Sequence, residues 1–377
     1  MSGAGASRID ATIKRLHVRR IDALMPRPWV PHAPHLHVLV VEVETSDGLI
    51  GTGFSWTPTI ATTAVRALLE DDIHHFVIGE TADPQHLWPR LWAHLHEAGG
   101  GGVTTIAMAG LDLALWDIAG IRSGLPLADL IGRRRATVAT YGSGVNLHYT
   151  LAELVAQAER WVASGFDTVK IKVGRPDLAE DVARVGAVRD VLGPHRTLLI
   201  DANQRWDLPR AIRSLNALAQ LDPGWIEEPL RADDTAGYRA LAAELGSWSG
   251  GAGIPIALGE NLHTIHRFRD LIDSGAAAVL QPNVIRVGGI TPFLEIAALI
   301  EASPAALAPH LLPEISGQLA MALPGEVHIE DVEDADFEAL GILARPSPVK
   351  FSRAGASSGP TLTDTGSPGL GLSFEDR

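Results

Sequence analysis

Cysteine is absent from this 377-residue chain, and no long stretch is purely apolar. Without a thiol, the chain can form no disulfide, no thiolate nucleophile and no cysteine-ligated zinc site. No run approaches the roughly 18 uncharged apolar residues that a membrane-spanning helix needs. The first residues, Met1 to Ser7, lack the apolar core of a secretion signal. We therefore expect a globular, cytoplasmic protein that does not enter a membrane.

Positive charge is also scarce. The chain holds 31 Lys and Arg against 45 Asp and Glu, which gives a net charge of −14. This balance argues against nucleic acid or an anionic membrane as a partner, because both are themselves negative. It also means that an anionic small molecule needs a local positive site, supplied by lysine or by a metal ion.

Lysine is the rarer of the two long basic residues. The chain holds four lysines, and two of them, Lys170 and Lys172, stand one residue apart. They alternate with Val169, Ile171 and Val173, a period of two that indicates a buried strand with both ammonium groups on one face. Two like charges in an apolar setting lower a lysine pKa, so one of them can act as a base. The alternative is an edge strand with a solvated polar face.

Strand and helix patterns divide the chain into three parts. Residues 8–56 read as antiparallel strands, and helical patterns follow up to Arg122, which predicts an α+β domain over residues 1–135. Over residues 136–332, strands alternate with helices, which indicates an α/β fold with a parallel (β/α) TIM barrel. Residues 333–377 are rich in proline, glycine and serine, and we expect them to return to the first domain. The expected barrel strands are Val138–Tyr141, Thr168–Val173, Thr197–Asp201, Trp225–Glu227, Ile254–Gly259, Ala277–Leu280, Ala306–Ala308 and Val327–Ile329.

Three successive strands of the expected barrel end in an acid: Asp201, Glu227 and Glu260. Residues at the carboxyl ends of barrel strands meet at one mouth. Three buried carboxylates there would repel one another and take up protons unless a cation neutralised them. A hard divalent cation with oxygen ligands and open positions is the natural solution, and magnesium is the first choice.

An imidazole follows strand seven, because the stretch Leu307–His310 places His310 across the mouth from the two lysines. Strand eight adds Glu330, and strand six ends at Asn283. A metal ion between a lysine and a histidine suits removal of a proton next to a carboxylate. The cations stabilise the enediolate that forms, and the lysine or histidine acts as the base.

These motifs resemble the mandelate racemase-like branch of the enolase superfamily over essentially the whole chain. The stretches concerned are Val169–Gly174, Asp201–Asn203, Ile226–Pro229, Gly259–Asn261 and Val287–Thr291, with Ala114–Asp117 in the first domain. The resemblance implies a capping domain on a modified barrel, with Mg²⁺ on Asp201, Glu227 and Glu260.

The same resemblance implies roles for the remaining residues. Lys172 and His310 would be the two opposing acid/base groups, and Lys170 would contact the substrate carboxylate. Glu330 would be a hydrogen-bonding acid near the substrate oxygen. Loops around Arg27–His35 and Phe54–Thr57 would close over the site and select the substrate. The further expected substrate contacts are Asn203, Ser143, Trp56, Arg27 and, from its place after strand one, His148.

One position departs from the family pattern. The usual partner of the histidine is an aspartate at the end of strand six, and here that residue is Asn283. The cycloisomerase branch, which has a catalytic lysine at this position, fits poorly too. An amide can orient His310 but cannot stabilise its cation as a carboxylate would, so we expect a lowered pKa for His310. This weakens His310 as a base more than as an acid that protonates a departing hydroxide.

We therefore expect a magnesium-dependent carbon–oxygen lyase that dehydrates a sugar acid, an aldonate or aldarate, to a 2-keto-3-deoxy acid. Lys172 would take the α-proton, and His310 would help the hydroxide leave. The alternative on the same site is a racemase or epimerase of a hydroxy or amino acid. A third alternative is a non-catalytic barrel that only binds an acid ligand. The expected partners are a small-molecule carboxylate and, as is common in the family, further copies of the chain in a homo-oligomer.

Overall fold

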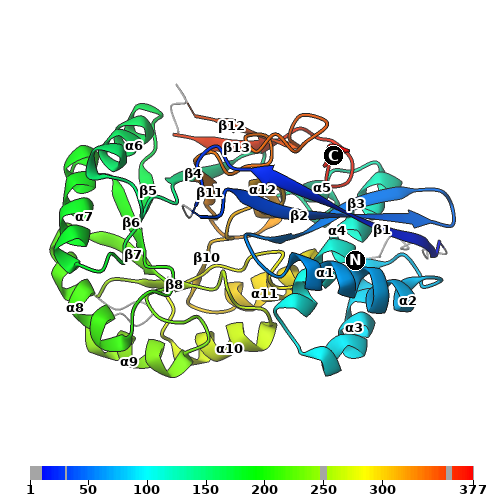
Figure 1. Cartoon of the computed structure of the whole chain (residues 1–377), viewed down its shortest axis with the longest axis horizontal. Coiled ribbons are helices and arrows are strands. Elements are labelled where there is room, and N and C mark those ends of the chain that lie inside the picture. The colour runs from blue at the N-terminus through cyan, green and yellow to red at the C-terminus, as the bar shows by residue number, and fades with distance from the viewer. Residues whose placement is uncertain (1–10, 30–31, 247–252, 354–358, 377) are drawn as a thin grey trace.

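The structure is a computed structural model that describes residues 11–29, 32–246, 253–353 and 359–376. Its two parts lie side by side in Figure 1, with a ring of strands and helices on the left and a smaller α+β cap on the right. Residues 8–10, 30 and 31, which the sequence assigns to strands and to the proline-rich loop of the cap, lie outside the described residues.

The cap contains an antiparallel sheet of three strands, β1 (Ile13–Leu24), β2 (His35–Thr45) and β3 (Ile50–Thr57). The central strand β2 is buried on both faces from Val38 to Val41, whereas β1 alternates between buried and exposed residues. The antiparallel strands expected from the sequence are confirmed.

Helices cover one face of this sheet (Figure 1). Asp83 begins the longest outer helix, because its carboxylate accepts hydrogen bonds from the backbone N–H groups of Gln85 and His86. The first cap helix begins at Thr62 and continues into a π-helical turn over Leu69–Ile73. The cap helices are α1 (Thr62–Leu68), η1 (Leu69–Ile73), α2 (His74–Val77), α3 (Pro84–Leu95), η2 (His96–Ala98), α4 (Val103–Ser123) and α5 (Leu127–Ile131).

Helix α4 is the core of the cap and faces the barrel. Within the described part of the chain, it is the one helix long and apolar enough to cross a membrane, but 89% of its apolar window is buried inside the protein. It is therefore a core helix. Its backbone touches strand β3, because a Cβ on Gly53 would lie 2.2 Å from the Gly110 carbonyl oxygen. Glycine at both positions allows this close approach.

The larger part alternates parallel strands with helices from residue 138 onward. The strands are β4 (Val138–Ser143), β5 (Thr168–Lys172), β6 (Thr197–Asp201), β7 (Pro223–Glu227), β8 (Ile256–Leu258), β9 (Val279–Leu280), β10 (Ala306–Leu307) and β11 (Ile329–Val332). The helices are α6 (Leu151–Ala163), α7 (Leu178–Leu192), α8 (Leu208–Leu218), η3 (Ala219–Leu221), α9 (Thr235–Leu245), α10 (Ile265–Ser274), α11 (Ile290–Glu301) and α12 (Pro313–Ala322).

Hydrogen bonds join these strands in the order β10, β9, β8, β7, β6, β5, β4 and β11, all of them parallel. All eight expected strands are present, although β9 and β10 have only two residues each. No ladder joins β10 to β11 among the described residues, so hydrogen bonds do not close the barrel there. After β10 the chain turns away, with left-handed backbone at Leu311 (φ 56°) and Leu312 (φ 52°), and enters α12.

A buried aspartate on α4 fastens the cap to the barrel. The Asp112 carboxylate accepts hydrogen bonds from the Thr291 backbone N–H (3.0 Å) and hydroxyl (2.6 Å) at the start of α11. The Trp116 indole N–H donates to the same hydroxyl at 3.0 Å. Both Asp112 and Thr291 are buried, so this contact holds the two domains in a fixed relative position.

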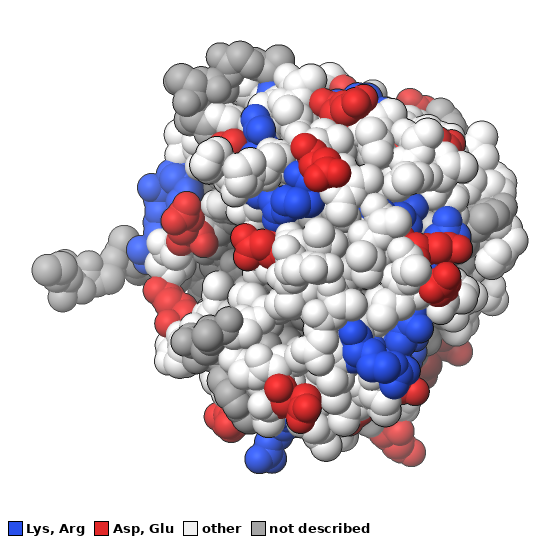
Figure 2. All heavy atoms as spheres, turned by 90° about the vertical axis from the view of Figure 1, so that its left-hand side faces the viewer, with Lys and Arg blue, Asp and Glu red and all other residues white. Residues whose placement is uncertain are grey.

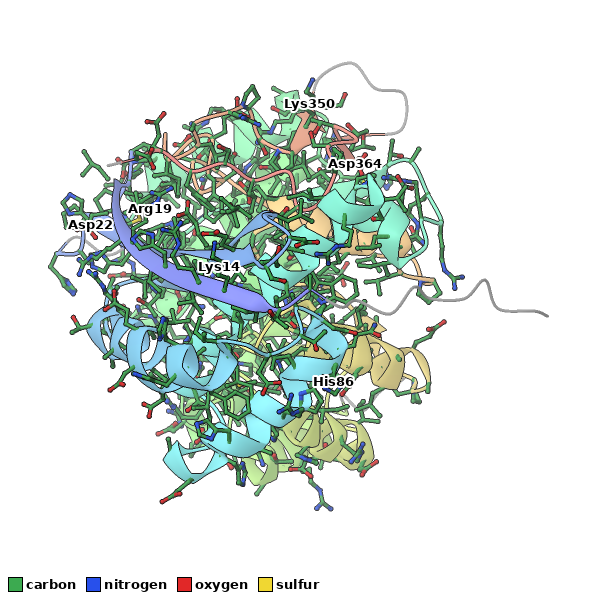
Figure 3. The ribbon with its side chains drawn as sticks, turned by 90° about the vertical axis from the view of Figure 1, so that its right-hand side faces the viewer. Lys14, Arg19, Asp22, His86, Lys350 and Asp364 are labelled. Carbon is green, nitrogen blue, oxygen red and sulfur yellow. The ribbon has the colours of Figure 1, made fainter. Side chains whose placement is uncertain are left out.

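The C-terminal segment contacts both domains. Its hairpin, β12 (Val349–Ser352) and β13 (Thr361–Asp364), pairs with barrel strand β4 rather than with the cap. Figure 3 shows Lys350 and Asp364 on this hairpin, apart from Lys14 and Arg19 on β1. The segment also contacts the cap, where the rings of Phe337 and Phe374 pack against Phe54 of β3 and the Leu370 N–H donates to Asp117 at 2.7 Å. The segment therefore contacts the barrel through its hairpin and the cap at residues before and after that hairpin.

The surface charge is mixed. On the outer face of the barrel helices, positive and negative side chains are scattered and often adjacent (Figure 2). The net charge of −14 is therefore not gathered into a single acidic patch on this face. This arrangement leaves the mouth of the barrel as the place where buried charge concentrates.

Candidate active site

Carboxylates gather at the mouth of the barrel as the strand ends require. Asp201 ends β6 and lies in register with Glu227, the last residue of β7. Glu260 follows β8 after Gly259, whose φ of 138° lets the chain bend toward the mouth. Asp201 and Glu227 are fully buried, and the Glu260 side chain is 11% exposed.

The raised pKa of Glu227 indicates that this carboxylate lacks enough positive charge around it. Burial raises the pKa of Glu227 to about 8, and the Asp201 carboxylate next to it adds to the effect. The Lys170 ammonium acts in the opposite direction but does not cancel it. Repulsion between carboxylates in a buried site is relieved by a cation, so the site fits a divalent metal ion.

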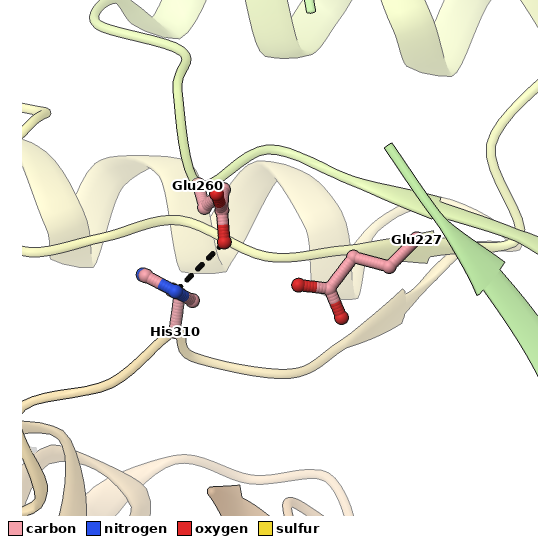
Figure 4. Close-up of side chains that lie close together, drawn as sticks. All are labelled: Glu227, Glu260 and His310. Carbon is pink, nitrogen blue, oxygen red and sulfur yellow. Dashed lines mark ion pairs between the residues drawn. The ribbon is translucent and has the colours of Figure 1, made fainter. Parts of the chain in front are cut away.

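The arrangement of the oxygen atoms supports the same conclusion. Ligand atoms of Glu227, Glu260 and His310 lie within 4.8 Å of one another (Figure 4). The Glu260 Oε2 atom is buried and accepts no hydrogen bond, although it lies 2.7 Å from His310 Nε2. Asp201 stands beside this group, but its oxygens contact Lys172 and the Asn203 N–H. Carboxylate oxygens from three neighbouring strand ends are the hard donors that Mg²⁺ prefers.

Lys170 and Lys172 do lie on one face of β5, as the alternation indicates, but their pKa values differ from expectation. Burial alone would lower both. The Lys170 ammonium, however, lies 2.7 Å from Glu227 and 2.8 Å from Glu330, and Lys172 contacts Asp201. These carboxylates raise the pKa of both lysines. The expected lowering is therefore wrong for this structure, because the sequence pattern did not reveal the counter-charges.

The expected lowering of the pKa of His310 is also wrong. Burial lowers this pKa, but Glu260 and Glu330 face His310 Nε2 at 2.7 and 4.0 Å and outweigh burial, so the pKa is raised. Asn283 acts on the opposite nitrogen, where its amide Nδ2 lies 2.9 Å from His310 Nδ1. The carboxylates on the Nε2 side thus replace the missing aspartate as the source of negative charge.

Backbone hydrogen bonds determine which way the Asn283 amide faces. Its Oδ1 accepts from the N–H groups of Ile285 (2.9 Å) and Arg286 (3.1 Å). The amide NH₂ must therefore point at His310 Nδ1, which accepts the hydrogen bond. In this geometry the proton of the imidazole resides on Nε2, the nitrogen that faces the carboxylates. His310 is consequently set up to donate a proton into the site.

A cavity of about 190 Å³ opens above these residues, between barrel and cap. At roughly 30 Å³ per water molecule, it holds a ligand the size of a small sugar acid and no larger chain. Trp29 and Trp56 from the cap cover it, edge to face with ring centroids 5.8 Å apart. The other lining residues are Pro58, Val145, Lys172, Asn203, Glu260, Asn261, Asn283, Arg286, His310, Leu311, Glu330 and Val332.

Some of the residues expected to contact the substrate line the cavity, and others do not. Trp56 and Asn203 line the cavity, while Ser143 lies behind it and donates to Glu330 Oε1 at 2.7 Å. Arg27 lies elsewhere, because it pairs with Glu153 on α6 at 2.8 Å and stacks 3.4 Å above the Tyr149 ring. It fastens the covering loop to the barrel and does not line the cavity.

His148 lines a separate, more open cavity of about 510 Å³ beside α8, on the far side of Trp29. The catalytic cavity has one charged lining residue that the sequence analysis did not include, Arg286, in the loop after β9. The signal was available, because Arg286 is a lone charge within the apolar stretch Val284–Val287 that precedes two glycines.

A barrel whose strand ends carry three acids between a lysine pair and a histidine, beneath an α+β cap, belongs to the class of proteins built for acid/base chemistry at a metal-bound carboxylate. Comparison with known proteins identifies the family. The model of the mandelate racemase / muconate lactonizing enzyme N-terminal domain matches residues 30–132, and that of the enolase C-terminal domain-like family matches residues 153–377. The chain belongs to the mandelate racemase / muconate lactonizing enzyme family of the enolase superfamily.

Three relatives illustrate the match. The 3,6-anhydro-alpha-L-galactonate cycloisomerase of Streptomyces coelicolor is 38% identical, over 78% of this chain and 80% of the relative. The L-talarate/galactarate dehydratase of Salmonella typhimurium is 36% identical, over 78% and 73%. A crystal structure of L-talarate dehydratase from a Polaromonas species, complexed with Mg and L-glucarate, superposes with a TM-score of 0.84 at 34% identity and covers 97% of this chain and 96% of that one.

Proposed function

We propose that this protein is a magnesium-dependent dehydratase that removes water from a sugar acid and yields a 2-keto-3-deoxy acid. The proposal rests on the chemical difference between the two groups that would transfer protons. An amine, Lys172, stands on one side of the acids, and His310, whose Nε2 proton faces the cavity, stands on the other. Dehydration needs one base and one acid, whereas racemisation needs a base on each face.

Asp201, Glu227 and Glu260 would hold the magnesium ion. When bound, Mg²⁺ supplies positive charge that stabilises the enediolate formed as the α-proton leaves. The carboxylate of the substrate would lie on the side of Lys170, whose ammonium is held between Glu227 and Glu330.

Lys172 can act as a base once the Asp201 carboxylate, its counter-charge, also binds the metal ion. Asp201 now raises its pKa, whereas burial and the nearby Lys170 lower it. Glu227 and Glu260 also raise it, and because these three carboxylates would all hold the metal ion, burial and Lys170 would then favour the neutral amine. The amine then takes the α-proton, and the electron pair of the C–H bond moves into the enediolate.

His310 completes the reaction on the other side. When His310 is protonated, which Glu260 and Glu330 favour, it would give the Nε2 proton to the β-hydroxyl as the C–O bond breaks, and the proton on its Nδ1 would displace the hydrogen bond from the Asn283 amide. The hydroxyl leaves as water, and the resulting enol isomerises to the 2-keto acid. Asn283 limits the role of His310 as a base, because in the neutral ring its NH₂ group favours the tautomer with the proton on Nε2, and that nitrogen then offers no lone pair to the cavity.

An isomerase is the second candidate. The relative that is 38% identical is a cycloisomerase, although the identity of residue 283 argued against that branch. An isomerase would use the same α-proton removal by Lys172 but would not release water from the β-carbon.

A screen of sugar acids with Mg²⁺ separates the candidates. We expect a 2-keto acid, detected as its semicarbazone, from at least one substrate. Lys172→Met should abolish both this product and α-proton exchange with D₂O, followed by NMR. His310→Asn should abolish the product but retain exchange. Exchange or ring formation without a 2-keto acid supports the isomerase, and ligand-induced thermal stabilisation without any reaction would make the protein a binder only.

A further inference from the structure

Arg286 reaches the catalytic cavity from the loop between β9 and α11. Its backbone is fixed at both ends of the residue: its N–H donates to Asn283 Oδ1 at 3.1 Å, and its carbonyl accepts from the His263 ring at 3.0 Å. The side chain lines the cavity together with Asn261 and Glu260. The backbone hydrogen bonds therefore hold Arg286 at the wall of the site.

This guanidinium lacks a partner. Among the described residues, Arg286 is the one arginine shielded from solvent whose side chain has neither a hydrogen bond nor an ion pair. Other partly buried arginines are paired, as Arg122 is with Asp47 and Arg133 with Asp129 and Asp364. Glu260 and Glu228 affect Arg286 only through space, and burial lowers its pKa. An arginine kept in this state is a binding group without its ligand.

The other cations of the site are already engaged. Lys170 is held between Glu227 and Glu330, and Lys172 contacts Asp201. Both stand on β5, whereas Arg286 follows β9, four strands further along the order of the sheet. Strands four apart in an eight-stranded barrel face each other, so Arg286 lies across the mouth from the lysine pair.

A guanidinium in a small cavity recognises a planar anion with two oxygens, because its parallel N–H groups form two hydrogen bonds to one carboxylate. The carboxylate next to the reacting carbon is already bound on the lysine side under the proposed mechanism. A hydroxyl at the other end of the substrate would not neutralise Arg286. A second carboxylate would.

We propose that Arg286 binds the distal carboxylate of the substrate, so the enzyme acts on sugar diacids (aldarates) in preference to aldonates. This inference rests on the proposed function and specifies its substrate class. It assigns the recognition of the second carboxylate to a residue that performs no proton transfer.

The test compares an aldarate with the aldonate of the same configuration, which differs only in the terminal group. We expect wild-type enzyme with Mg²⁺ to favour the diacid by about 100-fold in kcat/KM. Arg286→Gln should lower kcat/KM for the diacid about 100-fold and for the aldonate less than 3-fold. Arg286→Lys, which keeps the charge but loses the paired N–H groups, should fall between them. The control is Arg205→Gln, because Arg205 lines the neighbouring cavity and is exposed.

A binding measurement makes the test independent of turnover. In the inactive Lys172→Met background with Mg²⁺, calorimetry should show that adding Arg286→Gln weakens diacid binding at least 30-fold and leaves monoacid binding unchanged. Equal losses for diacid and monoacid, in kinetics or in binding, would overturn the role of Arg286 and leave dehydration intact. If wild-type enzyme forms a 2-keto acid from no sugar acid of the screen, the proposed function fails, and the binding experiment still decides whether Arg286 recognises a second carboxylate.

Discussion

Two regions of this molecule bury carboxylates, and they treat them differently. On α4, Asp112 and Asp117 meet neutral donors: Asp112 accepts from Thr291, and Asp117 accepts from the N–H groups of Thr52 (2.8 Å) and Leu370 (2.7 Å). At the barrel mouth, oxygen atoms of Glu260 and Glu330 are buried without a hydrogen bond, and cationic side chains surround them. The carboxylates on α4, which accept hydrogen bonds, connect neighbouring parts of the structure. The buried carboxylate oxygens at the mouth, which accept none from the described residues, indicate a site for a ligand.

The pKa values follow the same division. Burial raises the pKa of Asp112 to about 7 and of Asp117 to about 6, because neutral donors offset it only in part. At the mouth, burial also acts to raise the pKa, but His310 and the lysines outweigh it and bring the pKa of Glu330 to about 2 and that of Glu260 well below its usual range. The contacts of α4 thus tolerate protonated Asp112 and Asp117, whereas the barrel mouth keeps Glu260 and Glu330 ionised.

The largest expected effect comes from Glu260→Gln. This change removes one of the three proposed metal ligands, so we expect kcat to fall at least 1000-fold. The melting temperature without Mg²⁺ should fall, because the ionised Glu260 pairs with His310 in the folded protein and the variant leaves His310 without this counter-charge. The rise in melting temperature that Mg²⁺ gives the wild type should be lost.

Assays of keto acid formation and thermal melts with and without Mg²⁺ check this prediction. Glu301→Gln, at an exposed acid on α11, is the matched control and should retain both activity and the response to Mg²⁺. A Glu260→Gln protein that still gains stability from Mg²⁺ would contradict the assignment of the ligands.

Asp117→Ala should show the opposite pattern. It leaves the buried N–H groups of Thr52 and Leu370 without an acceptor, so we expect the free energy of unfolding to fall by about 2–4 kcal/mol. Asp117→Asn keeps one acceptor oxygen and should lose about half as much. Urea denaturation measures both changes. The kcat/KM of the folded protein should stay within 3-fold, and a larger loss at full stability would erase the contrast between the regions.

Stability should also depend on pH through α4. The folded protein binds more protons than the unfolded chain between the ordinary aspartate pKa of 3.8 and the raised values of about 7 for Asp112 and about 6 for Asp117. The free energy of unfolding therefore falls as pH rises through this window and loses this dependence above about pH 7.

Urea denaturation without Mg²⁺ at pH 5.5, 7 and 8.5 gives the slope. Asp112→Asn should flatten it between pH 5.5 and 7, since an amide does not titrate. Other buried groups contribute to the wild-type curve, so the difference between the two proteins is the quantity to compare. An unchanged slope in the variant would show that Asp112 is ionised throughout.

Arg27→Gln should have the smallest effect. Arg27 and Glu153 are 38% and 45% exposed, and such pairs contribute roughly 0–1 kcal/mol. Because the guanidinium lies outside the catalytic cavity, we expect kcat/KM to change by less than 3-fold in steady-state assays. A tenfold loss at unchanged melting temperature would instead make Arg27 the substrate contact that the sequence suggested.

The sequence predicted the parts of the site that follow from strand periodicity. Parallel strands place their ends at one mouth, so the positions of Asp201, Glu227 and Glu260 at successive strand ends were enough to group them. Long-range contacts set the remainder. The pKa direction of Lys172 depends on Asp201 across a strand pair, and the position of Arg27 depends on Glu153, which lies 126 residues away. Arg286 stands out in the structure because its side chain has no hydrogen bond or ion pair within the described part of the chain. The absence of a contact leaves no pattern in a sequence, so the sequence could not reveal it.

The contact between Asp117 and Leu370 has a consequence for synthesis in the cell. The two residues are 253 positions apart, and at about 5–20 residues per second a ribosome needs roughly 10–50 s to make the intervening chain. During that interval the Asp117 oxygen that will accept the Leu370 N–H has no permanent donor. The cap therefore finishes folding only after translation is nearly complete, and a message truncated near its end would yield a protein with an intact barrel mouth and an unfinished cap.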